Sequence, residues 1–295
     1  MNMSELLKKL ETYADSDYLP MHMPGHKRRM GDLGNPFFID ITEIDGFDDL
    51  HHAEGILKQA EERAAELYGS EETHYLVNGS TSGILAAISG CTAAGGTVLL
   101  ARNSHKSAYH AVLLRGLHVH YIYPQPAGKM GINGPVTAEN VDRLLEEHPE
   151  TKMVYITSPT YDGVVSDVEQ IAEVVHRRKL PLIVDEAHGA HFPFSEQFPK
   201  DSVSCGADVV IHSVHKTLPS LTQTALIHLN GDLINREKIR YFLGVYQSSS
   251  PSYVMMAGID QCMEWVSSHR KEFDSFAQRL QEVRAELRKL QALEL

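Results

Sequence analysis

One lysine follows an apolar stretch that has the composition of a buried strand. Residues 209–212 read Val-Val-Ile-His, and the chain continues into Ser213, His215, Lys216 and Thr217. Short apolar runs rich in β-branched residues favour a strand inside a sheet. A lysine at the mouth of such a strand loses part of its hydration, which lowers the pKa of its amine. Because a neutral amine can attack a carbonyl carbon and form a Schiff base, the stretch indicates covalent chemistry at Lys216.

A second apolar stretch ends in a carboxylate 31 positions before that lysine (216 − 185). Residues 180–184 read Leu-Pro-Leu-Ile-Val, and Asp185 follows them. If the two stretches are neighbouring parallel strands, Asp185 and Lys216 face one crevice at the same edge of the sheet. Pyridoxal phosphate (PLP) needs this pair, because a lysine binds its aldehyde and a carboxylate keeps its ring nitrogen protonated. The two residues together therefore predict a PLP site.

The composition narrows the class of protein. With 295 residues, of which 42% are hydrophobic, the chain can form one large α/β domain or two smaller ones. It has no apolar run long enough to span a bilayer, and its charged N-terminus does not resemble a signal peptide. Three widely spaced cysteines fit a reducing cytoplasm, so we expect a cytoplasmic location. The net charge of −12, without a basic block, argues against nucleic acid as a partner.

Strand and helix patterns alternate from about residue 54 to residue 230, which predicts a mainly parallel sheet with helices on both faces. The expected strands are a run that begins at 209 and the ranges 73–77, 97–101, 119–123, 153–157, 180–185 and 224–229. The expected helices are 4–14, 54–68, 84–89, 108–115, 137–147, 167–178, 235–243, 254–269 and 271–295.

Groups able to bind a phosphorylated, planar ligand follow two of the other strands. Residues 78–83 read Asn-Gly-Ser-Thr-Ser-Gly and open a helix, where free N–H groups and the helix dipole favour an anion. The alternative is an ordinary helix cap, since Ser and Thr are favoured there. His105, after strand 97–101, can lie flat on a ring or be a plain loop histidine. Residues 20–29, with two prolines and several cationic side chains, predict an ordered surface loop, an anion-binding segment or a subunit contact.

Together, these motifs resemble the ornithine/lysine/arginine decarboxylase family of bacteria, which are fold-type-I PLP enzymes with the aspartate aminotransferase fold. The resemblance extends over nearly the whole chain. It rests on five segments in the family's order, Met23-Pro24-Gly25-His26-Lys27, Asn78-Gly79-Ser80-Thr81-Ser82, Asn103-Ser104-His105-Lys106-Ser107, Asp185-Glu186-Ala187-His188-Gly189 and Ser213-Val214-His215-Lys216-Thr217.

The resemblance implies a role for each matching position. Lys216 would form the Schiff base with PLP, Asp185 would hold the pyridine nitrogen, and His105 would stack on the ring. His188 would sit beside the ring, near the cofactor's oxygen. The phosphate would be bound by a set of hydroxyl and imidazole groups, namely Ser80, Thr81, Ser82, Ser213 and His215. Two serines before Pro251, Ser249 and Ser250, resemble the segment that reaches the phosphate in a neighbouring subunit.

The implied function is decarboxylation of lysine, arginine or ornithine to CO2 and the corresponding polyamine-pathway amine. A homodimer or larger homo-oligomer with shared active sites is expected, with Lys216 or His188 reprotonating the substrate carbon. An acidic group would bind the substrate's distal cation. Residues 40–49 are a candidate for that group, although for any single residue a solvated acidic loop is the favoured interpretation.

The domain organisation is also predicted by this resemblance. Residues 1–50 would be an N-terminal arm, 51–260 the PLP-binding large domain, and 261–295 a helix leading to a small C-terminal domain. Family members usually continue into that small domain, which helps to close the active site. The chain ends before it, and we therefore expect a truncated form.

Three other functions remain open from the sequence. The first keeps PLP and changes the reaction to that of an aminotransferase or an aldolase/lyase. The second is a catalytically silent PLP-binding paralogue. The third is a metal hydrolase that uses His188 and His191, whose spacing fits one helical face. That reading lacks an HExxH motif and leaves Lys216 unexplained, so we expect no metal at the active site.

Overall fold

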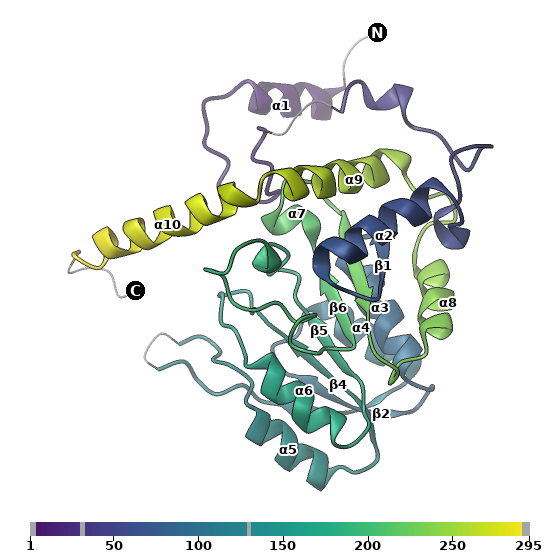
Figure 1. Cartoon of the computed structure of the whole chain (residues 1–295), viewed down its shortest axis with the longest axis vertical. Helices are drawn as coiled ribbons and strands as arrows, with labels where there is room; N and C mark the ends of the chain where they lie inside the picture. Colours follow the sequence, from purple (N-terminus) through teal and green to yellow (C-terminus); the bar gives the residue numbers. More distant parts are fainter. Residues whose placement is uncertain (1–3, 30–32, 129–130, 291–295) are drawn as a thin grey trace.

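The computed structural model describes residues 4–29, 33–128 and 131–290, and its centre is a seven-stranded sheet (Figure 1). The strands are β1 (Glu72–Leu76), β2 (Thr97–Ala101), β3 (His118–Ile122), β4 (Thr151–Thr157), β5 (Leu182–Asp185), β6 (Val209–His212) and β7 (Ala225–Leu229). All seven lie in the predicted places, with boundaries that differ by no more than a few residues.

The strand order is β1-β7-β6-β5-β4-β2-β3. Strands β2 to β6 pair in parallel with their neighbours, whereas β7 runs antiparallel to both β1 and β6. The prediction of a mainly parallel sheet is therefore confirmed. Because β4, β5 and β6 are adjacent and parallel, their carboxyl ends meet at one edge of the sheet, where open α/β folds bind ligands.

Helices cover both faces of the sheet. The helices of the described residues are α1 (Glu5–Ala14), α2 (Ile56–Tyr68), α3 (Gly79–Cys91), α4 (Lys106–Arg115), α5 (Ala138–Glu147), α6 (Val168–His176), α7 (Val214–Thr217), α8 (Arg236–Tyr246), α9 (Tyr253–Ser268) and α10 (Arg270–Leu287). Short 3₁₀ segments are found at Pro36–Phe38, Leu50–His52 and Phe192–Phe194.

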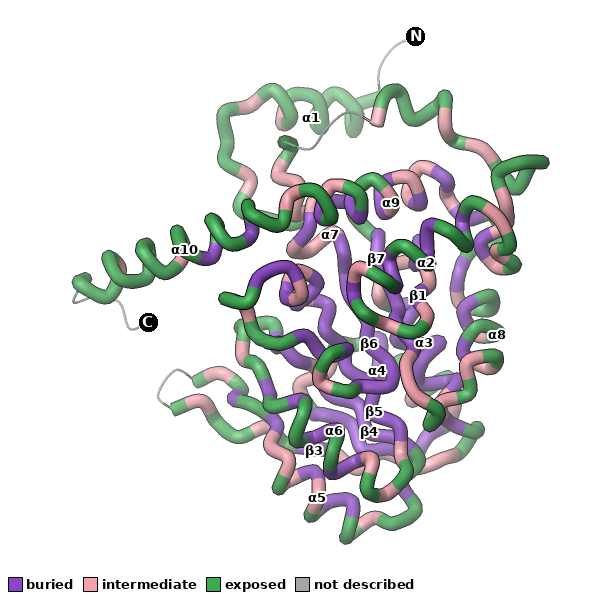
Figure 2. The backbone as a smooth tube through the Cα atoms, viewed as in Figure 1, coloured by how far each residue is buried: buried purple, intermediate pink, exposed green. Residues whose placement is uncertain are grey.

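Alternate residues along each strand pack against different helices, as the two-residue period of a strand requires. On one face, Leu100 and Tyr155 lie in a core shared with α3, α4 and α8. On the other face, Leu99 and Val154 pack with α5 and α6. The β1–β7 side of that face is covered by α2 and α9. The central strands are almost entirely buried in consequence, whereas only Ile122 is buried in the edge strand β3 (Figure 2).

Helix α3 begins five residues earlier than the expected range 84–89, so the hydroxyl-rich stretch is its first turn. Glycine and serine weaken a helix locally, and the sequence pattern therefore placed the start too late. Tertiary packing overrides that preference. A Cβ on Gly83 would lie 2.6 Å from Leu76 Cδ1, and one on Gly90 would lie 2.4 Å from Ile239 Cγ1. Glycine at these positions lets α3 approach β1 and α8 closely.

The two ends of the chain lie outside this layered core. The residues of α1 are exposed or half-buried, and α10 projects from the body with only Phe273 and Ala277 buried (Figures 1 and 2). The single helix expected over 271–295 is found as α10, and residues 291–295 lie outside the described part of the chain. The expected boundary at 260/261 falls inside α9, where Ile259 and Cys262 are both buried. Among the described helices, none is long and apolar enough to cross a membrane.

Candidate active site

Lys216 lies just beyond the carboxyl end of β6, on the single-turn helix α7. The turn forms because the backbone N–H of Lys216 donates to the carbonyl of Ser213, and that of Leu218 donates to Val214. The lysine is half-buried, and its Nζ lies 3.0 Å from His188 Nε2. Burial lowers the pKa of Lys216, and the charge of Asp185 opposes that shift. The amine is thus closer to its nucleophilic, neutral form than a surface lysine is.

Asp185 is the last residue of β5, next to β6, and is 2% exposed. Its carboxylate is oriented from two sides. The hydroxyl of Tyr155 donates to Oδ2 at 3.1 Å, and the backbone N–H of Ala187 donates to Oδ1 at 3.2 Å. Burial raises the pKa of Asp185, while the charge of Lys216 acts against the shift. As predicted, the two residues lie at the carboxyl ends of neighbouring parallel strands, and the charge of each acts on the pKa of the other.

Two histidines, His105 and His188, lie close enough to Lys216 for its charge to lower their pKa values. His105 precedes α4 and caps it, with Nδ1 accepting from the N–H of Ser107 at 3.3 Å. Partial burial lowers the pKa of His105, and Lys216 lowers it further. Burial, Lys216 and His105 together lower the pKa of His188 to about 4. These basic groups disfavour one another's charged forms, and a bound anion would relieve that repulsion.

The first turn of α3 approaches α7 beside these groups. Ser213 Oγ donates to Ser80 Oγ at 2.9 Å, which joins the two segments. Thr81 is exposed, whereas Ser82 is buried and donates its hydroxyl to the carbonyl of Gly79 at 2.8 Å. His215 Nδ1 donates to the carbonyl of Thr224 at 2.9 Å, so its Nε2 is the nitrogen left to accept or bind. The turn can therefore offer hydroxyl and N–H groups to a phosphate.

The sequence matches the major domain of the Orn/Lys/Arg decarboxylases over residues 4–295. The chain belongs to the Orn/Lys/Arg decarboxylase family.

Two curated relatives and one solved structure show how far the similarity extends. The chain is 40% identical over 274 residues to the uncharacterized protein YaaO of Bacillus subtilis (strain 168), covering 88% of this chain and 56% of YaaO. It is 34% identical over 259 residues to an arginine decarboxylase of the same organism, covering 85% of this chain and 53% of that enzyme. The chain thus spans about half the length of the curated relatives it matches.

The structure of lysine decarboxylase A from Pseudomonas aeruginosa aligns with a TM-score of 0.69 and 24% identity, covering 86% of this chain and 38% of that one. This likeness shows the fold. The expected PLP-dependent transferase-like architecture of fold type I is confirmed.

In this family member, the loop of residues 248–250, which precedes Pro251, lies beside the first turn of α3 of the same chain. The backbone N–H of Ser248 donates to Asn78 Oδ1 at 3.0 Å, and its carbonyl lies 2.8 Å from His51 Nε2. Ser249 and Ser250 are exposed. The loop is therefore close to the turn expected to bind phosphate, with its two serines open to solvent.

The acidic stretch 40–49 is partly used for local structure. The carboxylate of Asp48 accepts from the backbone N–H groups of Asp49, Glu54, Gly55 and Leu57, which fastens the start of α2. Burial alone would raise the pKa of Asp48, but these four donors lower it. Asp40, Glu43 and Asp45 are exposed.

His188 and His191 do not share a helical face, because residues 187–191 form turns. That premise of the metal-hydrolase alternative was wrong. His188 faces Lys216, whereas the ring of His191 packs against Phe192 and Phe198 with centroid distances of 4.9 and 4.8 Å.

A series of hydrogen bonds between buried polar side chains, next to the site, was not predicted from the sequence. Glu186 accepts from the N–H and hydroxyl of Ser202 and from His212 Nε2, at 2.8 Å for the histidine. His212 Nδ1 lies 3.0 Å from His228 Nε2, and His228 Nδ1 lies 2.8 Å from Thr73 Oγ1. Glu186 follows Asp185, and His212 precedes Ser213. This series of hydrogen bonds thus connects the two strand ends that carry the site. Its only signal in the sequence was the presence of polar residues within apolar runs.

The segment around Gly25 packs directly on the lysine turn of the same chain, a contact that the sequence did not predict. The backbone N–H of Gly25 donates to the carbonyl of His215 at 2.7 Å. A Cβ on Gly25 would lie 2.5 Å from the carbonyl oxygen of Leu218. Glycine is therefore needed for this close approach of two backbones.

We expect Gly25→Ala to loosen this contact, since neither backbone can move away cheaply. Overpacking of this kind costs about 1–3 kcal/mol. Limited proteolysis should show faster cleavage within residues 20–29, and PLP titration should show weaker binding. Gly244→Ala is the matched control, because the nearest atom to its new Cβ is 4.0 Å away. Equal rates of cleavage and equal PLP affinities in the two variants would show that the contact at Gly25 does not matter.

Proposed function

We propose that this family member is a PLP-dependent decarboxylase that converts lysine, arginine or ornithine to CO2 and the corresponding amine. The observation that carries the proposal is the coupling of buried Asp185 to half-buried Lys216 at the ends of neighbouring parallel strands. The similarity to an arginine decarboxylase supports the reaction. The choice among the three basic amino acids is left to the assay.

The side chains of the site fit PLP. When bound, PLP supplies an aldehyde that condenses with amines and a ring that withdraws electrons from the carbon losing CO2. The amine of Lys216 would hold the aldehyde, which its lowered pKa supports. The carboxylate of Asp185 would hold the proton on the ring nitrogen, and each of its oxygens keeps a lone pair beyond the bonds from Tyr155 and Ala187.

The phosphate would lie at the first turn of α3. Ser80 and Ser213 already form a contact there, and Thr81 is exposed to solvent. Ser82 would contribute mainly through its backbone, because its hydroxyl donates to Gly79. His215 would add its Nε2. His105, whose ring is exposed, would stack on the cofactor ring.

His188 would move a proton during the reaction. It lies 3.0 Å from the amine of Lys216, and with a pKa of about 4 it is neutral at neutral pH. A neutral imidazole can accept a hydrogen bond from the amine and so orient it. Lys216 or His188 would later return a proton to the substrate carbon.

The wider setting follows from the same proposal. We expect a cytoplasmic homodimer or larger homo-oligomer, in which Ser249 and Ser250 reach the phosphate of a neighbouring subunit. Their exposure supports this. Residues 1–50 would serve as an arm, 51–260 as the cofactor domain and 261–295 as a connection. Exposed Asp40, Glu43 and Asp45 are the members of the acidic stretch free to meet a substrate cation.

The test is to incubate the PLP-loaded protein with carboxyl-labelled lysine, arginine and ornithine. We expect labelled CO2 from at least one of them, with the amine as the second product. A keto acid would identify an aminotransferase instead. Cofactor binding without CO2 from any of the three would contradict decarboxylation and favour a silent paralogue.

A further inference from the structure

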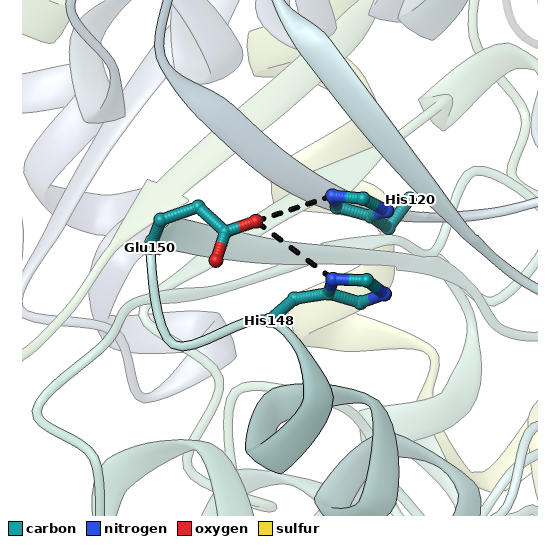
Figure 3. Close-up of side chains that lie close together, drawn as sticks. All are labelled: His120, His148 and Glu150. Atoms are coloured by element: carbon teal, nitrogen blue, oxygen red, sulfur yellow. Dashed lines mark ion pairs between the residues drawn. The ribbon is translucent and has the colours of Figure 1, made fainter.

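Three side chains with metal-binding atoms converge on the side of the sheet opposite the candidate active site. They are His120, His148 and Glu150, and their ligand atoms all lie within 4.8 Å of one another (Figure 3). His120 is in the middle of edge strand β3, and the other two are in the turn between α5 and β4. That turn precedes β4, at the amino ends of the parallel strands, whereas Lys216 lies beyond their carboxyl ends.

The fold brings these residues together through the strand period and a rigid turn. His120 pairs with Leu99 and lies on the same face of β3 as Ile122, two positions further on. Leu99 and Ile122 both pack in the core beneath α5 and α6. His120 therefore points to the face that carries α5. His148 ends that helix, with its N–H donating to Leu144. Its carbonyl accepts from the N–H and hydroxyl of Thr151, at 3.1 and 2.7 Å.

The donor atoms are those that a borderline divalent cation selects. One carboxylate oxygen, Oε1 of Glu150, lies 3.2 Å from His120 Nε2 and 3.8 Å from His148 Nδ1. Two imidazoles and a carboxylate are a frequent ligand set for Zn²⁺, and imidazole also suits Ni²⁺ and Cu²⁺. The three side chains are 35%, 27% and 50% exposed, so water can complete the coordination.

The two imidazole rings lie face to face beside the carboxylate. Their centroids are 3.4 Å apart and their planes 10° apart, and each ring turns one nitrogen towards Oε1 of Glu150 (Figure 3). A modest rotation about the Cβ–Cγ bonds, which is a soft torsion, would turn the two lone pairs towards a common point.

We propose that His120, His148 and Glu150 form a binding site for a divalent transition-metal cation of the Zn²⁺ class. The bound cation would join the α5–β4 turn to the edge strand β3. A covered edge strand is less open to pairing with other chains, so the site would stabilise an otherwise exposed border of the sheet. The proposal does not depend on PLP or on the decarboxylase activity.

The experiment is calorimetric titration of Zn²⁺ into chelator-treated, tag-free protein, with Co²⁺ absorption as a second readout. We expect one equivalent to bind and to raise the melting temperature. We expect a weaker affinity for Zn²⁺ in each of three variants, His120→Gln, His148→Gln and Glu150→Gln. Loss of a residue that only supports a metal ligand lowers metal affinity by ~10–100-fold, so loss of a ligand should lower it by at least as much. Circular dichroism without metal should show that the variants fold, because all three residues are partly exposed.

His52→Gln is the matched control. His52 also faces a carboxylate, Asp49, at 3.1 Å, but as a two-residue pair. Its substitution should leave the equivalent intact. The proposal is overturned if the wild-type protein binds no Zn²⁺, or if the three variants retain the same equivalent as His52→Gln.

Discussion

Lys216→Ala is expected to abolish the absorption band that PLP develops with this protein near the visible edge, together with decarboxylation. The variant loses both the amine that would hold the aldehyde and the partner of His188 Nε2. Positioned acid–base groups alone contribute about 10²–10⁴ in rate, and loss of covalent binding adds to that, so a fall of more than about 10⁴ is expected. The spectrum and the CO2 assay measure the two losses separately.

Lys238→Ala is the control for this variant. Lys238 is also half-buried and donates to the carbonyl of Thr92 at 2.7 Å, but it lies on α8 away from the site. It should keep the band and the activity. If Lys216→Ala retains the band while folded, another amine holds PLP and the assignment of Lys216 is wrong. If the band is lost and the wild-type protein still releases no CO2, the cofactor site stands and only the reaction fails.

Asp185→Asn is expected to separate activity from stability. The ring nitrogen would lose the anion that holds its proton, and activity should fall by about 10²–10⁴. Stability should move the other way. Burial raises the folded-state pKa of Asp185, so the ionised carboxylate weakens the cofactor-free protein as pH rises above the ordinary carboxyl pKa. The neutral amide avoids this cost. The cofactor-free variant should therefore melt no lower than the wild type at neutral pH.

Melting curves at neutral pH and below the ordinary carboxyl pKa, with the CO2 assay, test this prediction. The stability difference between variant and wild type should grow with pH. Asp208→Asn is the control for activity. Asp208 is also buried, and burial raises its pKa too, but it lies before β6 and accepts from His176 Nε2 and the N–H of Leu182, both at 2.8 Å. It should keep the cofactor spectrum and the activity. An Asp185→Asn variant with unchanged activity would contradict the proposed role.

The amino-acid sequence by itself determined the layered fold and the central pair of the candidate site. Apolar runs and helical periods are local, so strands such as 97–101 and 209–212 could be located from a few neighbouring residues. The rule that parallel strands end at one edge then placed Asp185 beside Lys216 without coordinates. His188 was expected beside the cofactor ring only from the resemblance to the decarboxylase family, and it lies 3.0 Å from the amine of Lys216.

Only the tertiary structure decided which distant residues meet. The hydrogen bonds that link Glu186, His212 and His228 depend on the register between β5, β6 and β7. The contact of Gly25 with Leu218 joins segments nearly two hundred positions apart in the sequence (218 − 25). His120 meets Glu150 because β3 presents that face to α5. A local pattern reports how deeply a residue is buried. It carries no information on the partner across an interface, because register and close approach are set by packing of the whole core.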